Sequence, residues 1–176
     1  MRFREVELGV FYPSSESLRV ALGDAEVAMV RERAQHVPRG RARICAHRSP
    51  DDPLHEMLIA LLAGGYVRPH RHRGRGESFH VVEGEATLVV FDEQGRATSR
   101  VELGLGPGKT RLHRMNAPEF HTVIVSRGCF VVHEVTLGPF RPGSTEVAPW
   151  APAEDDVDAI AAFMESLRAM LHEGIE

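Results

Sequence analysis

The strongest constraint on the fold is a series of short apolar runs in the middle of the chain, separated by turn residues at close intervals. The runs are rich in Val, Leu, Phe and Thr, and pairs such as Gly64–Gly65 and Gln94–Gly95 interrupt them. The runs expected to form strands are residues 58–63, 77–83, 86–92, 98–103, 109–114, 121–126 and 130–136. This texture predicts an all-β sandwich or barrel as the core of the protein.

Helical patterns flank the predicted strands on both sides. Residues 24–35 are expected to form a short helix, with Asp24 as a possible cap at its start. Residues 157–171 are expected to form a second helix, because their apolar side chains recur at helical spacing and acidic residues lie at its start. Residues 137–153 contain several prolines and are expected to form an irregular connection. We expect Trp150, in this connection, to pack against the barrel.

The length of 176 residues suits a single domain. Within it we expect three parts: an N-terminal extension with a short helix over residues 1–40, the barrel over 41–152, and a C-terminal helix packed on the barrel over 153–176.

Charge and hydropathy exclude several classes of protein. The formal net charge is −4 and the arginines are spread along the chain, so the sequence lacks the basic patch that nucleic-acid binding requires. The longest apolar run, residues 57–67, is too short to cross a bilayer, and residues 1–7 contain no apolar leader. We expect a cytoplasmic protein with no membrane partner, in which Cys45 and Cys129 are reduced, buried thiols.

Three histidines and one glutamate form a predicted metal site. In an extended strand, residues two apart point to the same face, so His70 and His72 can reach one ion. After a short glycine-containing turn, Glu77 begins the next strand and supplies a carboxylate, and His121 begins a later strand and supplies a third imidazole. This donor set suits one divalent ion per chain, either Fe, Mn, Ni or Zn.

Other polar residues are candidates for orienting a small-molecule ligand beside the metal. Arg68 has the strand parity of the two neighbouring histidines, while Tyr66 and His113 are placed to offer a hydroxyl and an imidazole. For each of them, ordinary packing or surface exposure is the alternative interpretation. The same alternative holds for His47 and His133, which are further candidates for the cavity wall.

The arginines at positions 71, 73 and 75 are expected to face solvent or a partner. Because open sheet edges need covering, and arginine-rich faces and terminal segments can cover them, we expect a homodimer.

The spacing of these residues resembles the first motif of the cupin superfamily, G-x5-H-x-H-x4-E-x6-G. Gly64, His70, His72, Glu77 and Gly84 satisfy every interval of that motif. The resemblance implies a cupin double-stranded β-helix, which is a jelly-roll barrel, with a divalent metal at these ligands.

The second cupin motif usually contains P-x-G-x-x-H, whereas residues 117–121 keep the proline and the histidine and lack the glycine. His121 is therefore the least securely assigned ligand. A wider resemblance, to the WbuC family of cupin-fold metalloproteins, rests on residues 46–53, 66–72, 91–96, 120–123, 138–140 and 148–154. Members of that family are associated with bacterial surface-polysaccharide clusters, and the family has no settled reaction.

Three functions are compatible with this sequence. The first is a metal-dependent enzyme, of oxygenase or isomerase type, that acts on a small polar, anionic or sugar-derived substrate. The second is a module that binds or senses such a ligand without catalysis, which a cavity lacking any proton-transfer group would favour. The third is a structural metal site, which closed tetrahedral coordination would favour.

Overall fold

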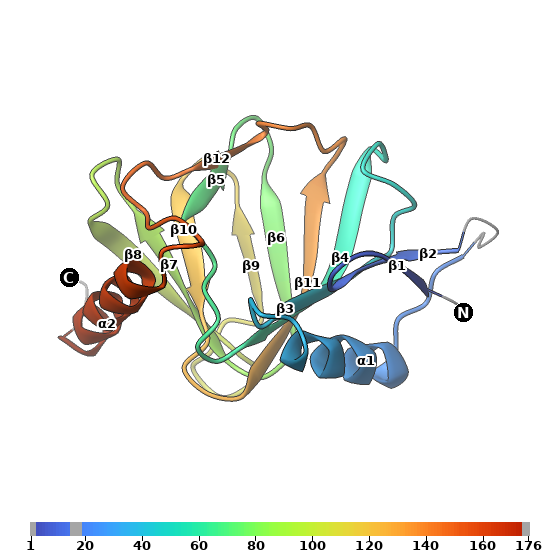
Figure 1. The fold of residues 1–176 in the computed structure, drawn as a ribbon, viewed down its shortest axis with the longest axis horizontal. Coiled ribbons are helices and arrows are strands. Elements are labelled where there is room, and N and C mark those ends of the chain that lie inside the picture. The colour runs from blue at the N-terminus through green and yellow to red at the C-terminus, as the bar shows by residue number, and fades with distance from the viewer. Residues whose placement is uncertain (1–2, 15–18, 174–176) are drawn as a thin grey trace.

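The computed structural model describes residues 3–14 and 19–173, which form two β-sheets and two helices (Figure 1). The strands are β1 Phe3–Glu7, β2 Val10–Pro13, β3 Arg41–Cys45, β4 Leu54–Leu62, β5 His70–His72, β6 Glu77–Glu83, β7 Ala86–Phe91, β8 Ala97–Leu103, β9 Leu112–Met115, β10 Phe120–Ile124, β11 Cys129–Leu137 and β12 Thr145–Val147. The helices are α1 Asp24–Gln35 and α2 Val157–Glu173. The predicted all-β core with one helix near each end is confirmed.

The two sheets face each other as the walls of a barrel. The larger sheet has the strand order β1-β2-β3-β4-β11-β6-β9, and the smaller has the order β12-β5-β10-β7-β8. Strand alternation gives each sheet one inward face, so Leu88 and Val90 of the smaller sheet meet Phe130 and Val132 of the larger sheet in one apolar cluster. This cluster fills only part of the barrel, and the rest is a cavity.

Helix α1 covers the outer face of the larger sheet. Its residues Val30 and Ala34 are fully buried against Ile44, Leu58 and Val131, whose side chains point away from the barrel interior. In Figure 1 the blue helix accordingly lies against β3 on the outside of the barrel. Successive residues of β3 therefore alternate between the helix and the barrel interior.

Helix α2 covers the smaller sheet together with the segment before it. Met164 and Leu167 pack on Val89 and Ile124 in a second outer cluster. Trp150 lies in this cluster, with its ring centroid 5.0 Å from that of Phe91, which confirms the predicted packing role of this tryptophan.

Besides the seven predicted runs and the extended strand assumed for His70 and His72, the structure has four further strands, and it moves the ends of others by a few residues. β1 and β2 lie in the segment assigned to the N-terminal extension and join the larger sheet, while β12 is a three-residue strand inside the predicted irregular connection. β3 was missed because its sequence, Arg-Ala-Arg-Ile-Cys, sets two arginines on the inward face, where a core strand is expected to be apolar. The strand predicted over residues 109–114 is shorter and spans Leu112–Met115.

The two glycines that end the cupin-like motif have different roles. Both have positive φ, +81° at Gly64 and +78° at Gly84. A Cβ at Gly84 would collide with the carbonyl oxygen of Cys129, whereas a Cβ at Gly64 would have no heavy atom within 4 Å. Only Gly84 is therefore required for close packing of two strands as well as for its backbone conformation.

We expect Gly84→Ala to lower the free energy of unfolding by about 1 to 3 kcal/mol more than Gly64→Ala, because the backbone of β11 must move in addition. Gly64→Ala alone should cost about 1 to 2 kcal/mol from its left-handed backbone. Urea unfolding of the two variants checks this, and equal losses would contradict it.

Candidate functional site

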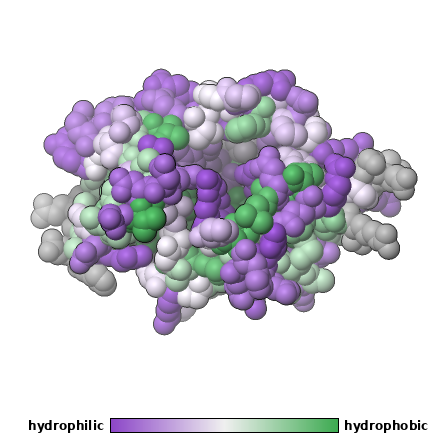
Figure 2. Space-filling view, viewed as in Figure 1, coloured by the Kyte–Doolittle hydropathy of each residue, from purple (hydrophilic) through white to green (hydrophobic). Residues whose placement is uncertain are grey.

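A large cavity lies between the sheets, with a volume of about 870 Å³. The face shown in Figure 2 is hollowed near the middle of the molecule, and hydrophilic residues form much of the surrounding rim. Strands of both sheets line the cavity, and its polar lining includes His70, His72, Glu77, His121 and Glu134.

The structure brings the four predicted metal ligands together at one place on the cavity wall. His70 and His72 come from β5, His121 from the adjacent strand β10, and Glu77 from the start of β6 in the opposite sheet. The ring centroid of His70 lies 4.7 Å from that of His121 and 5.0 Å from that of His72. The Glu77 carboxylate lies 2.9 Å from His121 Nε2 and 3.6 Å from His72 Nε2. Residues separated by up to 51 positions therefore converge on one small volume.

His121 and Glu77 form a buried, charged pair in this arrangement. Burial by itself would lower the pKa of His121, but the hydrogen bond and the negative charge of Glu77 outweigh it and raise that pKa. Burial would likewise raise the pKa of Glu77, and the hydrogen bond from His121 lowers it instead. The contact therefore favours the charged form of each group, with His121 Nε2 donating to the carboxylate.

Hydrogen bonds to backbone carbonyls hold the Nδ1 atoms of two imidazoles in place. His70 Nδ1 donates to the carbonyl oxygen of Arg68 at 2.8 Å, and His121 Nδ1 donates to that of Glu119 at 2.9 Å. A carbonyl can only accept, so each Nδ1 carries a proton and each Nε2 is the nitrogen turned towards the cluster. Metal-binding histidines are commonly oriented by a hydrogen bond of this kind from the ring nitrogen that does not bind the metal.

His72 is arranged differently. Its Nδ1 accepts from the Arg75 guanidinium at 3.1 Å and lies 3.1 Å from the Thr145 hydroxyl. Arginine only donates, so Nδ1 holds the lone pair here and the proton is on Nε2. If Nδ1 instead donates to Thr145, Nε2 becomes free to bind a metal, which requires Arg75 to turn away from the ring.

In this conformation, no group of three or more His, Cys, Asp or Glu side chains among the described residues is spaced to hold a metal ion. In the same conformation, His121 and Glu77 bond directly to each other. The chemistry of the donor set nonetheless fits a divalent ion, with three imidazoles and one carboxylate in a buried cluster. Metal would have to displace the protons that now bridge the donors.

The predicted orienting residues separate into two groups. Arg68 lines the cavity, with its guanidinium bonded to the carbonyl oxygen of Ala151 at 3.0 Å. Tyr66 does not line it, because its hydroxyl donates to the carbonyl oxygen of Pro152 and its ring packs beside Phe163. His113 is half-buried on β9 and is also outside the cavity lining.

The further histidines also differ in position. His47 lies in the cavity wall, stacked on His55 with ring centroids 4.0 Å apart. His133 lies outside the cavity, on the outer face of β11, where it stacks on His80.

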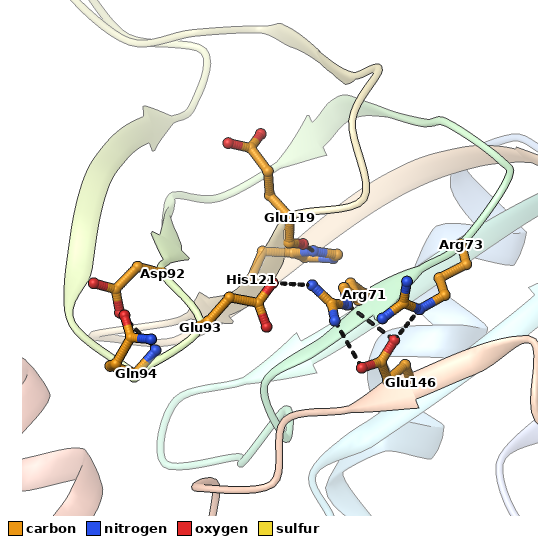
Figure 3. A network of polar contacts seen from close by, with 8 residues as sticks. All are labelled: Arg71, Arg73, Asp92, Glu93, Gln94, Glu119, His121 and Glu146. Atoms are coloured by element: carbon orange, nitrogen blue, oxygen red, sulfur yellow. Dashed lines mark hydrogen bonds and ion pairs between the residues drawn. The ribbon is translucent and has the colours of Figure 1, made fainter.

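The expectation that Arg71 faces solvent or a partner is wrong. Its side chain does point away from the metal ligands, but it is only 8% exposed. It makes a two-pronged contact with Glu146, bonds to Glu93, and lies 4.1 Å over the ring of Phe120. Figure 3 shows this network, in which Arg73 also reaches Glu146. The network ties β5, which carries two predicted ligands, to β12 and to the turn after β7.

Arg75 also departs from the expectation, because it lines the cavity beside His72.

The network predicts a specific dependence of stability on pH. Hydrogen bonds from Arg71 and then Arg73 lower the pKa of Glu146 from 4.5 to about 2. The stabilisation from ionised Glu146 should therefore be fully present above about pH 5 and be lost as the pH falls towards 2. We expect Glu146→Gln to melt at a lower temperature than wild type at pH 7, with the difference shrinking below pH 4.

The matched control is Glu32→Gln, at an exposed glutamate on α1. Thermal unfolding followed by circular dichroism across this pH range checks the prediction. A difference between wild type and Glu146→Gln that stayed constant with pH would contradict it.

Sequence reasoning missed several charged residues of the cavity. Three of them, Arg41, Arg43 and Glu134, bear on its chemistry. Each lies in a strand at the parity of inward-facing neighbours, for example Glu134 between Val132 and Thr136 on β11. The signal was therefore present as a charge on the core face of a strand. An inward charge in a barrel strand is itself an indication of a functional cavity.

Glu134 is a cavity residue with a strongly shifted pKa. Burial raises its pKa, as does the negative charge of Glu77, and these effects outweigh Arg43, His121 and Arg41, so that the pKa is about 7. A carboxyl group of this kind exists in both protonation states near neutral pH. It can therefore accept a proton and return it.

Sequence comparison matches part of the chain to one family model. A family model described as a domain of unknown function, DUF6016, matches residues 22–103, which is less than half of the chain. No curated protein matches the chain in sequence.

Solved structures identify the fold. Protein SO0799 from Shewanella oneidensis has a TM-score of 0.55 at 14% identity, over 73% of this chain and 84% of that one. The L-ribose isomerase of Geodermatophilus obscurus has a TM-score of 0.51 at 16% identity, over 63% and 70%. A cupin superfamily protein from Desulfitobacterium hafniense has a TM-score of 0.43 at 17% identity, over 55% and 76%. The predicted cupin fold is confirmed, and similarity at these identities establishes the fold alone.

Neither helix in the described part of the chain is long and apolar enough to span a membrane.

Proposed function

We propose that this protein is a metal-dependent cupin enzyme that moves a proton within a small, acidic, sugar-derived substrate, as an isomerase or epimerase does. One observation carries the proposal, namely the convergence of His70, His72, Glu77 and His121 on the wall of the 870 Å³ cavity. A buried cluster of this kind inside a concave, substrate-sized space is the usual form of an active site.

These four residues would hold the ion, with Nε2 of each imidazole and the Glu77 carboxylate as donors. A divalent ion there would act as a Lewis acid on a substrate oxygen, and so make a neighbouring C–H bond more acidic. His70 and His121 need little rearrangement for this role, because backbone carbonyls already fix their rings. The network of Arg71, which lies between the two histidines of β5, holds this strand in place.

Glu134 supplies the proton-transfer group in this proposal. It lines the same cavity as the ligands, and Glu77 and His121 influence its charge directly. It would take a proton from one substrate carbon and return it to the same or a neighbouring carbon, so that no oxidant or reductant is needed. The presence of such a group favours an enzyme over a module that only binds its ligand.

Two likenesses support a sugar-derived substrate. The similarity in fold to an L-ribose isomerase fits the proposed reaction class. The resemblance to the WbuC family points to sugars of surface-polysaccharide metabolism.

The test is solvent exchange. Metal-loaded protein is incubated in D2O with a panel of aldoses, ketoses, sugar phosphates and sugar acids, and proton NMR follows the loss of carbon-bound hydrogen. We expect exchange in at least one substrate, and none with the His70→Ala/His72→Ala variant. Saturable binding of a sugar without any exchange would overturn the catalytic proposal and support the binding module.

A further inference from the structure

We infer that Arg41 and Arg43 form an oxyanion-binding subsite inside the cavity, separate from the metal ligands. The subsite would hold a phosphate or carboxylate group of the ligand. That this group belongs to the substrate of the metal site rests on the proposed function, whereas the existence of the subsite does not.

The backbone of β3 places both arginines in the cavity. Arg43 pairs with Ile59 and Arg41 with Leu61, which are inward residues of β4. The residues between and beyond them, Ala42 and Ile44, are buried on the opposite face under α1. The two guanidinium groups therefore share one face and start about 7 Å apart along the strand.

Both arginines lack a matching anion. Among residues 3–14 and 19–173, neither forms an ion pair within 4 Å, although many surface arginines do, for example Arg31 with Glu83 at 2.7 Å. Arg43 Nε is fully buried and has no hydrogen-bond partner among the described residues. Burial, followed by the like charge of Arg43, lowers the pKa of Arg41. Two neighbouring, partly buried cations of this kind are suited to an anion that enters the cavity.

The whole cavity has an excess of positive side chains. Six arginines and four glutamates line it. Two of those glutamates are already engaged, since Glu154 pairs with Arg39 and Glu77 pairs with His121. Arg68 Nε and Arg75 Nε are also buried without a partner in the described part of the chain.

The two arginines and Glu77 lie on different strands of the larger sheet, whereas the three histidine ligands lie on the smaller sheet opposite. β4 and β11 separate β3 from β6, which places the backbones of β3 and β6 about 14 Å apart across the sheet before their side chains reach inward. Glu134 is on β11, one of the two strands between β3 and β6, and the charges of both Arg43 and Glu77 influence it. A ligand with an acidic group at one end and hydroxyl or carbonyl oxygens at the other fits this arrangement.

Arginine chemistry defines the ligand class. A guanidinium donates two parallel hydrogen bonds to an oxyanion, and two guanidiniums can surround phosphate or carboxylate. Phosphate offers more oxygens and more charge, so it should bind more tightly than a carboxylate.

The experiment is isothermal titration of the purified full-length protein with inorganic phosphate and, separately, with acetate at equal ionic strength. We expect the wild-type protein to bind phosphate saturably. The affinity for phosphate should be at least about tenfold lower in Arg41→Gln/Arg43→Gln. Arg31→Gln, at the exposed pair on α1, is the matched control and should bind as wild type does. If acetate binds as tightly as phosphate, the subsite is a carboxylate site; weaker acetate binding identifies a phosphate site.

The His70→Ala/His72→Ala variant separates this inference from the proposed function. We expect it to keep phosphate affinity within about threefold of wild type. If phosphate binding is lost in this variant and kept in Arg41→Gln/Arg43→Gln, the metal ligands bind the anion and the inference is wrong. If phosphate binds through the arginines while native protein contains no metal, the proposed function fails and the subsite stands.

Circular dichroism verifies that each variant is folded. If Arg41→Gln/Arg43→Gln does not fold, the single variant Arg43→Lys replaces it. Lysine keeps the charge and loses the two-pronged hydrogen bond, so phosphate affinity should still fall measurably. Unchanged affinity in a folded Arg43→Lys protein would overturn the inference.

Discussion

Replacing His70 and His72 together with alanine is expected to reduce bound divalent metal from about one ion per chain to below about a tenth. The two residues provide two of the four proposed donors, and the remaining pair, Glu77 and His121, would bond to each other instead, as the 2.9 Å contact between them shows. Elemental analysis of protein purified without a metal-affinity tag measures the change.

The matched control is His80→Ala/His133→Ala. These two histidines also stack on each other, with ring centroids 5.8 Å apart, but they lie on the outer face of the larger sheet. Metal content should remain at the wild-type level in this variant. Folded native protein without metal, or equal loss in both variants, would contradict the proposed site.

The identity of the metal bears on function. Manganese, iron or nickel is often six-coordinate, which leaves positions for substrate beside four protein donors. Stoichiometric tetrahedral zinc would have its coordination filled by those donors and would favour a structural role.

The second large effect is expected from Glu134→Gln. The amide keeps the size of the side chain and cannot accept and return a proton, so solvent exchange of the substrate should slow by about a hundredfold to ten-thousandfold. Metal content should stay at about one ion per chain. The measurement is the initial rate of deuterium incorporation by the metal-loaded variant, with the substrate that the wild-type screen identifies.

Glu56→Gln is the control, because Glu56 is a glutamate of β4 that lies near His133 on the outside of the barrel. Its exchange rate should equal that of wild type. A Glu134→Gln variant that exchanges at the wild-type rate would show that another group, such as His47 or Tyr12 of the cavity wall, moves the proton.

Much of the fold was readable in the sequence because strand and helix periodicities are local properties. The strand over Glu77–Glu83 and the helix over Asp24–Gln35 have the predicted boundaries. The parity of His70 and His72 likewise follows from the two-residue repeat of a strand. That these residues bind metal, that the protein is a homodimer and that it is cytoplasmic remain predictions.

The rest depended on contacts between distant parts of the chain. The inward position of Arg41 and Arg43 became apparent only when β3 was placed between α1 and the cavity. Arg71 looked exposed until Glu93 and Glu146 were brought over it. Tyr66 and His113 had suitable chemistry but are positioned elsewhere.

The sequence by itself therefore determined most of the central strands, both helices, and which side chains within one strand share a face, since neighbouring backbone geometry fixes these. The tertiary structure decided which of those faces meet across the barrel and which charges are buried. Burial and charge pairing depend on residues far apart in the chain, and these set the acidity of Glu134 and the unmatched charge of the two arginines.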